Sequence, residues 1–77
     1  MQKSTHTRQY RVFLDWLIEA RKDSGLTQQQ VADKLGRPQS FVAKYENGER
    51  RLDVVEFLEI ANLLDADPHG IIDAISG

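Results

Sequence analysis

The sequence contains no cysteine and only two histidines, His6 and His69, which stand near opposite ends of the chain. Without cysteine, neither a disulfide nor a thiolate-bound metal can form. No histidines or carboxylates have the spacing typical of a metal site, so we expect no metal and no cofactor. The separated histidines also argue against a serine–histidine–acid arrangement, and no phosphate-binding glycine loop is present. We therefore predict that the protein is not an enzyme.

Long apolar runs are also missing: none approaches the roughly 18 residues that a membrane-spanning helix needs. The first eight residues are polar and lack the apolar centre of a signal peptide. We expect a soluble intracellular protein with no membrane partner, in which residues 1–7 are flexible. The 77 residues are predicted to form one domain, 1–77, too small to include a separate sensing domain. No small-molecule ligand is expected.

Basic residues are absent from the last third of the chain. Residues 52–77 have a balance of −6, whereas residues 1–51 contain all ten Lys/Arg and have a balance of +4. A phosphate backbone responds to the nearest surface more than to the total charge of −2. The N-terminal two thirds therefore suit a nucleic-acid partner. A chance asymmetry of a small surface is the alternative.

Apolar residues recur three and four positions apart without strand-like alternation, which predicts five helices and no strand. The first helix is predicted from Thr7 to Ser24, because Gly25 follows in a position that favours a left-handed cap. Its apolar face is expected to contain Phe13, Leu14, Trp16, Leu17, Ile18 and Ala20.

The second helix has a clear start, since Thr27 and Gln30 form a capping-box pattern. Gly36 is predicted to end this helix after about two turns. The third helix is expected to begin with Pro38 in its first turn and to end at Asn47 and Gly48.

The fourth helix repeats the capping pattern with Asp53 and Glu56. Its buried side is predicted to comprise Val54, Phe57, Leu58, Ile60, Ala61 and Leu64. Asp67 and Pro68 open a short fifth helix that carries three isoleucines, Ile71, Ile72 and Ile75.

The second and third helices are too short to be stable alone and must be held by packing. Val31, Leu35, Val42 and Tyr45 are placed to share a core. The outer face of the third helix is then left with Gln39, Ser40, Ala43 and Lys44, with Phe41 beside them. A projecting helix with short polar side chains near its start suits the major groove of DNA. Residues 27–46 are thus the predicted helix-turn-helix unit.

Three stretches, GLTQQQVADKLG, QSFVAKYENGERR and LEIANLLDADP, resemble the phage repressor/Cro-like, or XRE, family of bacterial and phage helix-turn-helix proteins. The resemblance runs from about Phe13 to Ile72. It implies an all-α, compact five-helix lambda-repressor-like domain. It also implies a transcriptional regulator, most simply a repressor, that binds double-stranded DNA sequence-specifically as a homodimer on a palindromic operator. The expected location is the cytoplasm, in association with the nucleoid.

The resemblance implies roles for individual residues. Gln39, Ser40 and Lys44 match positions that contact bases, and Phe41 either touches a thymine methyl or packs against the second helix. The phosphate contacts it implies are Thr27, Gln28, Asn47, Gly48, Arg50 and Arg51. Of the two adjacent arginines, we expect one to reach phosphate and the other to be merely exposed. Arg21 and Glu46 match a structural salt bridge.

Arg37 and Pro38 depart from the family pattern, which has a small apolar residue and then Ser or Thr at these positions. A charged head cannot fill an apolar slot, although its stem can. Either the slot is open here or Arg37 leans toward DNA, and we favour a base contact by Arg37.

The dimer seam has two candidates. Ile71, Ile72 and Ile75 offer more apolar surface than one short terminal helix needs, unless all three pack internally. The other candidate comprises Tyr10, Leu14 and Trp16. The competing function is a protein-interaction module of the same fold, such as an antitoxin or adaptor, whose acidic residues 52–77 dock a basic partner.

Overall fold

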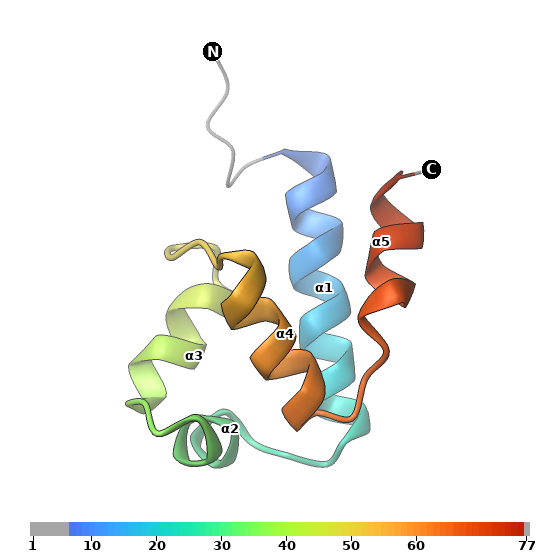
Figure 1. Cartoon of the computed structure of the whole chain (residues 1–77). Coiled ribbons are helices and arrows are strands. Elements are labelled where there is room, and N and C mark those ends of the chain that lie inside the picture. Colours follow the sequence, from blue (N-terminus) through green and yellow to red (C-terminus); the bar gives the residue numbers. More distant parts are fainter. Residues whose placement is uncertain (1–6, 77) are drawn as a thin grey trace.

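The computed structural model describes residues 7–76, which form five helices and contain no strand. These are α1 (Arg8–Asp23), α2 (Gln28–Leu35), α3 (Gln39–Glu46), α4 (Val54–Leu63) and α5 (Pro68–Ser76). The predicted all-α, five-helix architecture is confirmed. In Figure 1, α2 and α3 lie toward one side of the molecule, and α5 runs beside α1 on the other. No helix in the described part of the chain is long and apolar enough to cross a membrane.

Local capping signals define the helix starts as the sequence predicted. Thr27 and Gln30 form a complete capping box on α2, and Asp53 and Glu56 form one on α4. Each box satisfies two backbone N–H groups that have no partner within the helix. Gly36 ends α2 with φ 70° and ψ 32°, the left-handed conformation that glycine adopts without steric cost.

One boundary prediction needs correction. Pro38 does not occupy the first turn of α3 but precedes it as the N-cap, with extended backbone at φ −68° and ψ 153°. Residues 1–7 were expected to be flexible. Residues 1–6 lie outside the described part of the chain, so this stays a prediction. Thr7 is the N-cap of α1, where its hydroxyl accepts a hydrogen bond from the backbone N–H of Tyr10.

A single apolar core joins all five helices. Its fully buried members include Leu17 from α1, Val31 from α2, Tyr45 from α3, Ile60 from α4 and Ile71 from α5. Helices of eight residues gain little stability from their own hydrogen bonds, so this shared burial holds α2 and α3 in place. The core therefore fixes the angle at which α3 projects.

The burial predicted for α4 was wrong at two positions. Val54 is 70 % exposed and Leu58 is 48 % exposed. Phe57, Ile60, Ala61 and Leu64 form the inner stripe instead. Leu58 lies about 100° around the helix from Phe57 and therefore faces outward. Val54 is in the first turn, at the rim of the core.

The two predicted dimer seams need correction at three of their six residues, which are already buried. Ile71, Tyr10 and Leu14 are buried within their own chain, at 1 %, 9 % and 1 % exposure. They close the contacts of α1 and α5 with the core, so they cannot cover a second chain. Of the three isoleucines, only Ile72 is exposed, at 54 %, while Ile75 is half-buried.

Candidate nucleic-acid interface

Helix α3 separates its polar residues from its core residues. Phe41, Val42, Tyr45 and Glu46 are buried, whereas Gln39, Ser40 and Lys44 are exposed. Ser40 and Lys44, four positions apart, lie on the same face of the helix, and Gln39 is the first residue of the same helix. The sequence predicted this division correctly except at Phe41, for which two positions had been considered. The phenyl ring is 9 % exposed and packs edge-on against Tyr45 at 5.5 Å between centroids. Phe41 is therefore a packing residue of α3 and is not exposed to a ligand.

A buried ion pair anchors the C-terminal end of α3 to α1. Arg21 donates from Nε to Glu46 Oε2 at 2.7 Å and from Nη2 to Glu46 Oε1 at 3.1 Å. The Glu46 side chain is only 5 % exposed. The hydrogen bond to Glu46 raises the pKa of Arg21 above its ordinary value and keeps the guanidinium charged. The salt bridge predicted from the sequence is present.

Gln28 connects this ion pair to the exposed start of α3. Its Nε2 donates to Glu46 Oε1 at 2.9 Å, and its Oε1 accepts from Gln39 Nε2 at 2.7 Å. A carboxylate can only accept, so Glu46 determines the orientation of the Gln28 amide, which in turn determines that of Gln39. Gln39 is left with its Oε1 and one N–H available for other partners. This acceptor and donor pair matches N6 and N7 of adenine.

Four residues form what we call the arginine clamp: Arg37, Phe41, Arg50 and Glu56. The Cζ atoms of Arg37 and Arg50 lie 4.4 Å and 4.8 Å from the centroid of the Phe41 ring. Arg50 donates two hydrogen bonds to Glu56, at 3.0 Å and 2.9 Å, and these bonds lower the pKa of the Glu56 carboxyl. The Arg37 side chain does not extend fully into solvent. Its guanidinium packs on the Phe41 ring, and its Nη2 lies 3.8 Å from Glu56 Oε2.

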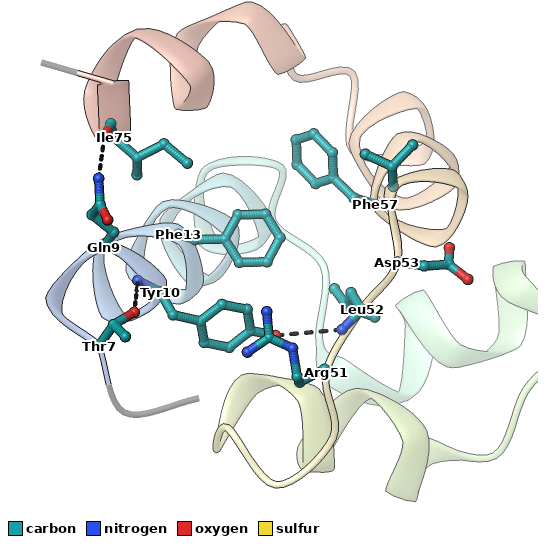
Figure 2. A pocket seen from close by; sticks show the side chains of 10 residues that line it. Thr7, Gln9, Tyr10, Phe13, Arg51, Leu52, Asp53, Phe57 and Ile75 are labelled. Atoms are coloured by element: carbon teal, nitrogen blue, oxygen red, sulfur yellow. Dashed lines mark hydrogen bonds between the residues drawn. The ribbon is translucent and has the colours of Figure 1, made fainter. Parts of the chain in front are cut away.

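Arg51 has a different environment from Arg50. Its Cζ lies 4.5 Å from the centroid of the Tyr10 ring, and no ion pair involves it within residues 7–76. Figure 2 shows its guanidinium over that ring, at the edge of a groove of about 330 Å³. Tyr10, Phe13, Phe57 and Ile75 line the groove. No sequence pattern predicted this groove, since its walls come from α1, from the segment around the start of α4 and from α5, which are far apart in the chain.

The loop after α3 carries the remaining predicted phosphate contacts. Asn47 caps α3 and is exposed. Gly48 has φ 81°, and a side chain there would meet Leu14 at 3.4 Å. Thr27 is exposed at the start of α2, beside Gln28. The loop, the start of α2 and the exposed face of α3 are thus all held by the same packed unit.

The sequence missed two residues that organise this surface. Glu56 was recognised only as a capping residue, although it also binds Arg50 and approaches Arg37. Tyr10 was considered only for the second candidate dimer seam, whereas its ring lies under the Arg51 guanidinium and its hydroxyl accepts a hydrogen bond from the backbone N–H of Leu52 at 3.4 Å. No local sequence pattern predicts the contacts of Glu56 or Tyr10, because their partners are not neighbours on the same helix.

Comparison with known proteins agrees with this geometry. Residues 17–71 match the model of the helix-turn-helix family, which covers most of the chain. A solved XRE-family like protein from Pseudomonas syringae pv. tomato str. DC3000 is 46 % identical, with a TM-score of 0.85. That match covers 92 % of this chain and 87 % of the other. The chain therefore belongs to the XRE-type helix-turn-helix family, and membership supports DNA binding and a role in transcription regulation.

A second relative is a longer protein that this chain matches only in part. An uncharacterized HTH-type transcriptional regulator, YqaE of Bacillus subtilis (strain 168), is 41 % identical over 54 residues. These residues are 70 % of this chain but 47 % of the relative, so the match spans about half of that protein.

Proposed function

We propose that the protein is a sequence-specific regulator of transcription, acting as a repressor, that inserts α3 into the major groove of DNA. The observation that carries this proposal is the division of α3 into a buried face and an exposed face of Gln39, Ser40 and Lys44. Glutamine suits adenine, lysine suits guanine, and serine serves either a base or a phosphate. Arg37 stands directly before this helix, with a side chain that is 42 % exposed.

The backbone contacts that we propose surround α3 on two sides. Thr27 and Gln28 stand at the start of α2, where the backbone N–H groups and the helix dipole favour an anion. Asn47, Gly48 and Arg51 belong to the loop on the other side. Such contacts fix the register of the protein on DNA but carry little sequence information. Arg51 is the stronger of the two adjacent arginines for this role, because Arg50 is already bound to Glu56.

We further propose a homodimer on a palindromic operator. One reading helix covers few base pairs, and two-fold dimers place half-sites about 34–36 Å apart. After the correction of the predicted seam, Ile72 is the most exposed isoleucine of α5 and the natural centre of a contact. Ile72→Glu should convert the dimer to a monomer in sedimentation velocity. A wild-type protein that sediments as a monomer, free and on DNA, would contradict this part.

Selection of bound sites from a random duplex pool is the direct test of sequence-specific binding. We expect enrichment of a palindrome whose half-sites are one helical turn apart. Affinity should fall linearly with the logarithm of salt concentration, because phosphate contacts release counterions. No enrichment, with binding that is absent or independent of salt, would exclude the proposal.

A protein-interaction module is the second candidate, and the surface of α4 and α5 favours it. These helices carry no lysine or arginine, and Asp53, Glu59, Asp65, Asp67 and Asp73 are exposed on or beside them. Val55 and Leu58 are exposed on α4 as well. Under this candidate, the protein binds a basic partner and no DNA. The same salt titration distinguishes the two, because only the first requires affinity for a duplex.

A further inference from the structure

The arginine clamp holds its two arginines unequally. Arg50 makes two hydrogen bonds to Glu56 and a third to the backbone carbonyl of Arg51 at 2.7 Å. Arg37 has only one approach to Glu56, at 3.8 Å, which is too long for a hydrogen bond. The Glu56 side chain is 15 % exposed, whereas that of Arg37 is 42 % exposed. Arg37 is therefore the member that can leave most easily.

Glu56 offers Arg37 the same chemistry as a DNA phosphate. Carboxylate and phosphate oxygens both accept charge-assisted hydrogen bonds from a guanidinium. Arg37 stands two residues before Gln39, the first residue of α3, so DNA that receives the start of α3 comes close to Arg37. A partly exposed ion pair of this length contributes little stability, so exchange between partners has a low cost.

We propose that Glu56 competes with DNA for Arg37 and thereby limits the affinity of this protein for any duplex. On docking, the Arg37 guanidinium leaves Glu56 for a phosphate, in place of the base contact favoured from the sequence, while Arg50 remains bound to Glu56 and keeps the loop in place. The inference rests on the proposed function, since it requires that α3 faces DNA. It makes Glu56 a residue that sets affinity without touching DNA.

Glu56→Gln tests the competition, and Glu59→Gln is its matched control. Both residues lie on α4, one turn apart, and line the same small cavity beside Arg37 and Phe41. Each change removes one negative charge. Affinity for a random-sequence duplex should rise about two- to fivefold more for E56Q than for E59Q, the range that corresponds to a partly exposed ion pair.

The sign of the effect separates competition from a purely structural role. If Glu56 only held the loop in shape, E56Q would bind DNA more weakly than the wild type. Equal gains in E56Q and E59Q would show that overall charge alone matters. Either result would overturn the proposal. If E56Q does not fold, Glu56→Asp retains the charge but withdraws the carboxylate from Arg37. E56D is then expected to bind DNA more tightly than the wild type, and an unchanged affinity would reject the competition.

The double variant R37A/E56Q identifies the arginine that is released. Its affinity should exceed that of R37A by no more than E59Q exceeds the wild type. A full gain in the R37A background would assign the effect to Arg50 and overturn the role of Arg37. If the wild-type protein bound no duplex, the proposed function itself would be wrong. Binding by the wild type with equal E56Q and E59Q affinities would remove only this inference.

Discussion

Replacing Arg21 by methionine should leave a carboxylate buried without its main partner. Glu46 accepts two hydrogen bonds from Arg21 and one from Gln28, and its side chain is 5 % exposed. The Arg21→Met change keeps an apolar stem of similar length but removes both guanidinium bonds to Glu46, and also the bond from Arg21 Nη1 to the backbone carbonyl of Leu26 at 3.0 Å. Only the Gln28 amide then remains to stabilise the charge of Glu46. The expected result is a large loss of stability.

The magnitude follows from the burial of the pair. Loss of one partner of a buried ion pair costs about 3–5 kcal/mol, because the other charge has already lost its hydration. The Arg21 side chain is 14 % exposed, so some water reaches the site and we expect about 3 kcal/mol. In a domain of this size, each kcal/mol lowers the Tm by about 4–8 °C. R21M should therefore melt about 12 °C or more below the wild type.

The assay is urea and thermal unfolding followed by circular dichroism, with a control on the same helix. Arg11 pairs with Asp15 at 3.5 Å, but their side chains are 58 % and 62 % exposed. Arg11→Met should therefore cost less than about 0.5 kcal/mol. The double variant R21M/E46M, which strands no charge, should return to within about 1 kcal/mol of the wild type. If R21M costs no more than R11M, the reasoning from burial is refuted.

Four further predictions concern the proposed interface and its frame. Gln39→Ala should weaken binding to the selected operator by about 1–3 kcal/mol and barely affect random duplex, whereas equal loss on both would remove Gln39 from base recognition. Arg51→Ala should weaken both alike and lower the slope of log affinity against log salt by about one, and an unchanged slope would remove Arg51 from the phosphate contacts. Gly36→Ala should cost about 1–2 kcal/mol in urea unfolding because φ is 70°, and a neutral effect would contradict the left-handed cap. The hydrogen bonds from Arg50 hold the pKa of Glu56 below its ordinary 4.5, so the stability that Glu56 adds over E56Q should be present at pH 7 and disappear as pH falls through the lowered pKa. Urea unfolding of both proteins at pH 7 and pH 3 measures this, and a difference that does not change with pH would contradict it.

The helices and their boundaries were predictable because their signals are local. Thr27 with Gln30 and Asp53 with Glu56 are read within four residues of sequence, and the structure contains both capping boxes. Gly36 marks a turn whose backbone angle glycine adopts at little cost. Apart from Phe41, the inner and outer residues of α3 follow from helical period. Pro38 was misplaced by one position, since a proline is compatible with either side of a helix start.

Whether an individual apolar residue is buried or exposed was less predictable, because burial depends on where other helices end. The sequence cannot distinguish Ile71, which is buried, from Ile72, which is exposed, except through the packing of α5 against α1. Tyr10 and Leu14 were placed on an outer surface for the same reason. An apolar side chain near a helix end is buried only if a neighbour extends far enough to cover it.

By itself, the sequence determined the number and order of the helices, their caps, and the polar face of α3, since periodicity and capping act over a few residues. The resemblance to the family had already implied the Arg21–Glu46 pair. Tertiary structure alone decided the other meetings of long side chains: the path from Glu46 through Gln28 to Gln39, and the clamp of Arg37 and Arg50 on Phe41. The physical reason is that a hydrogen bond or ion pair requires partners within about 3–4 Å, and for residues far apart in sequence only the packed core sets such distances.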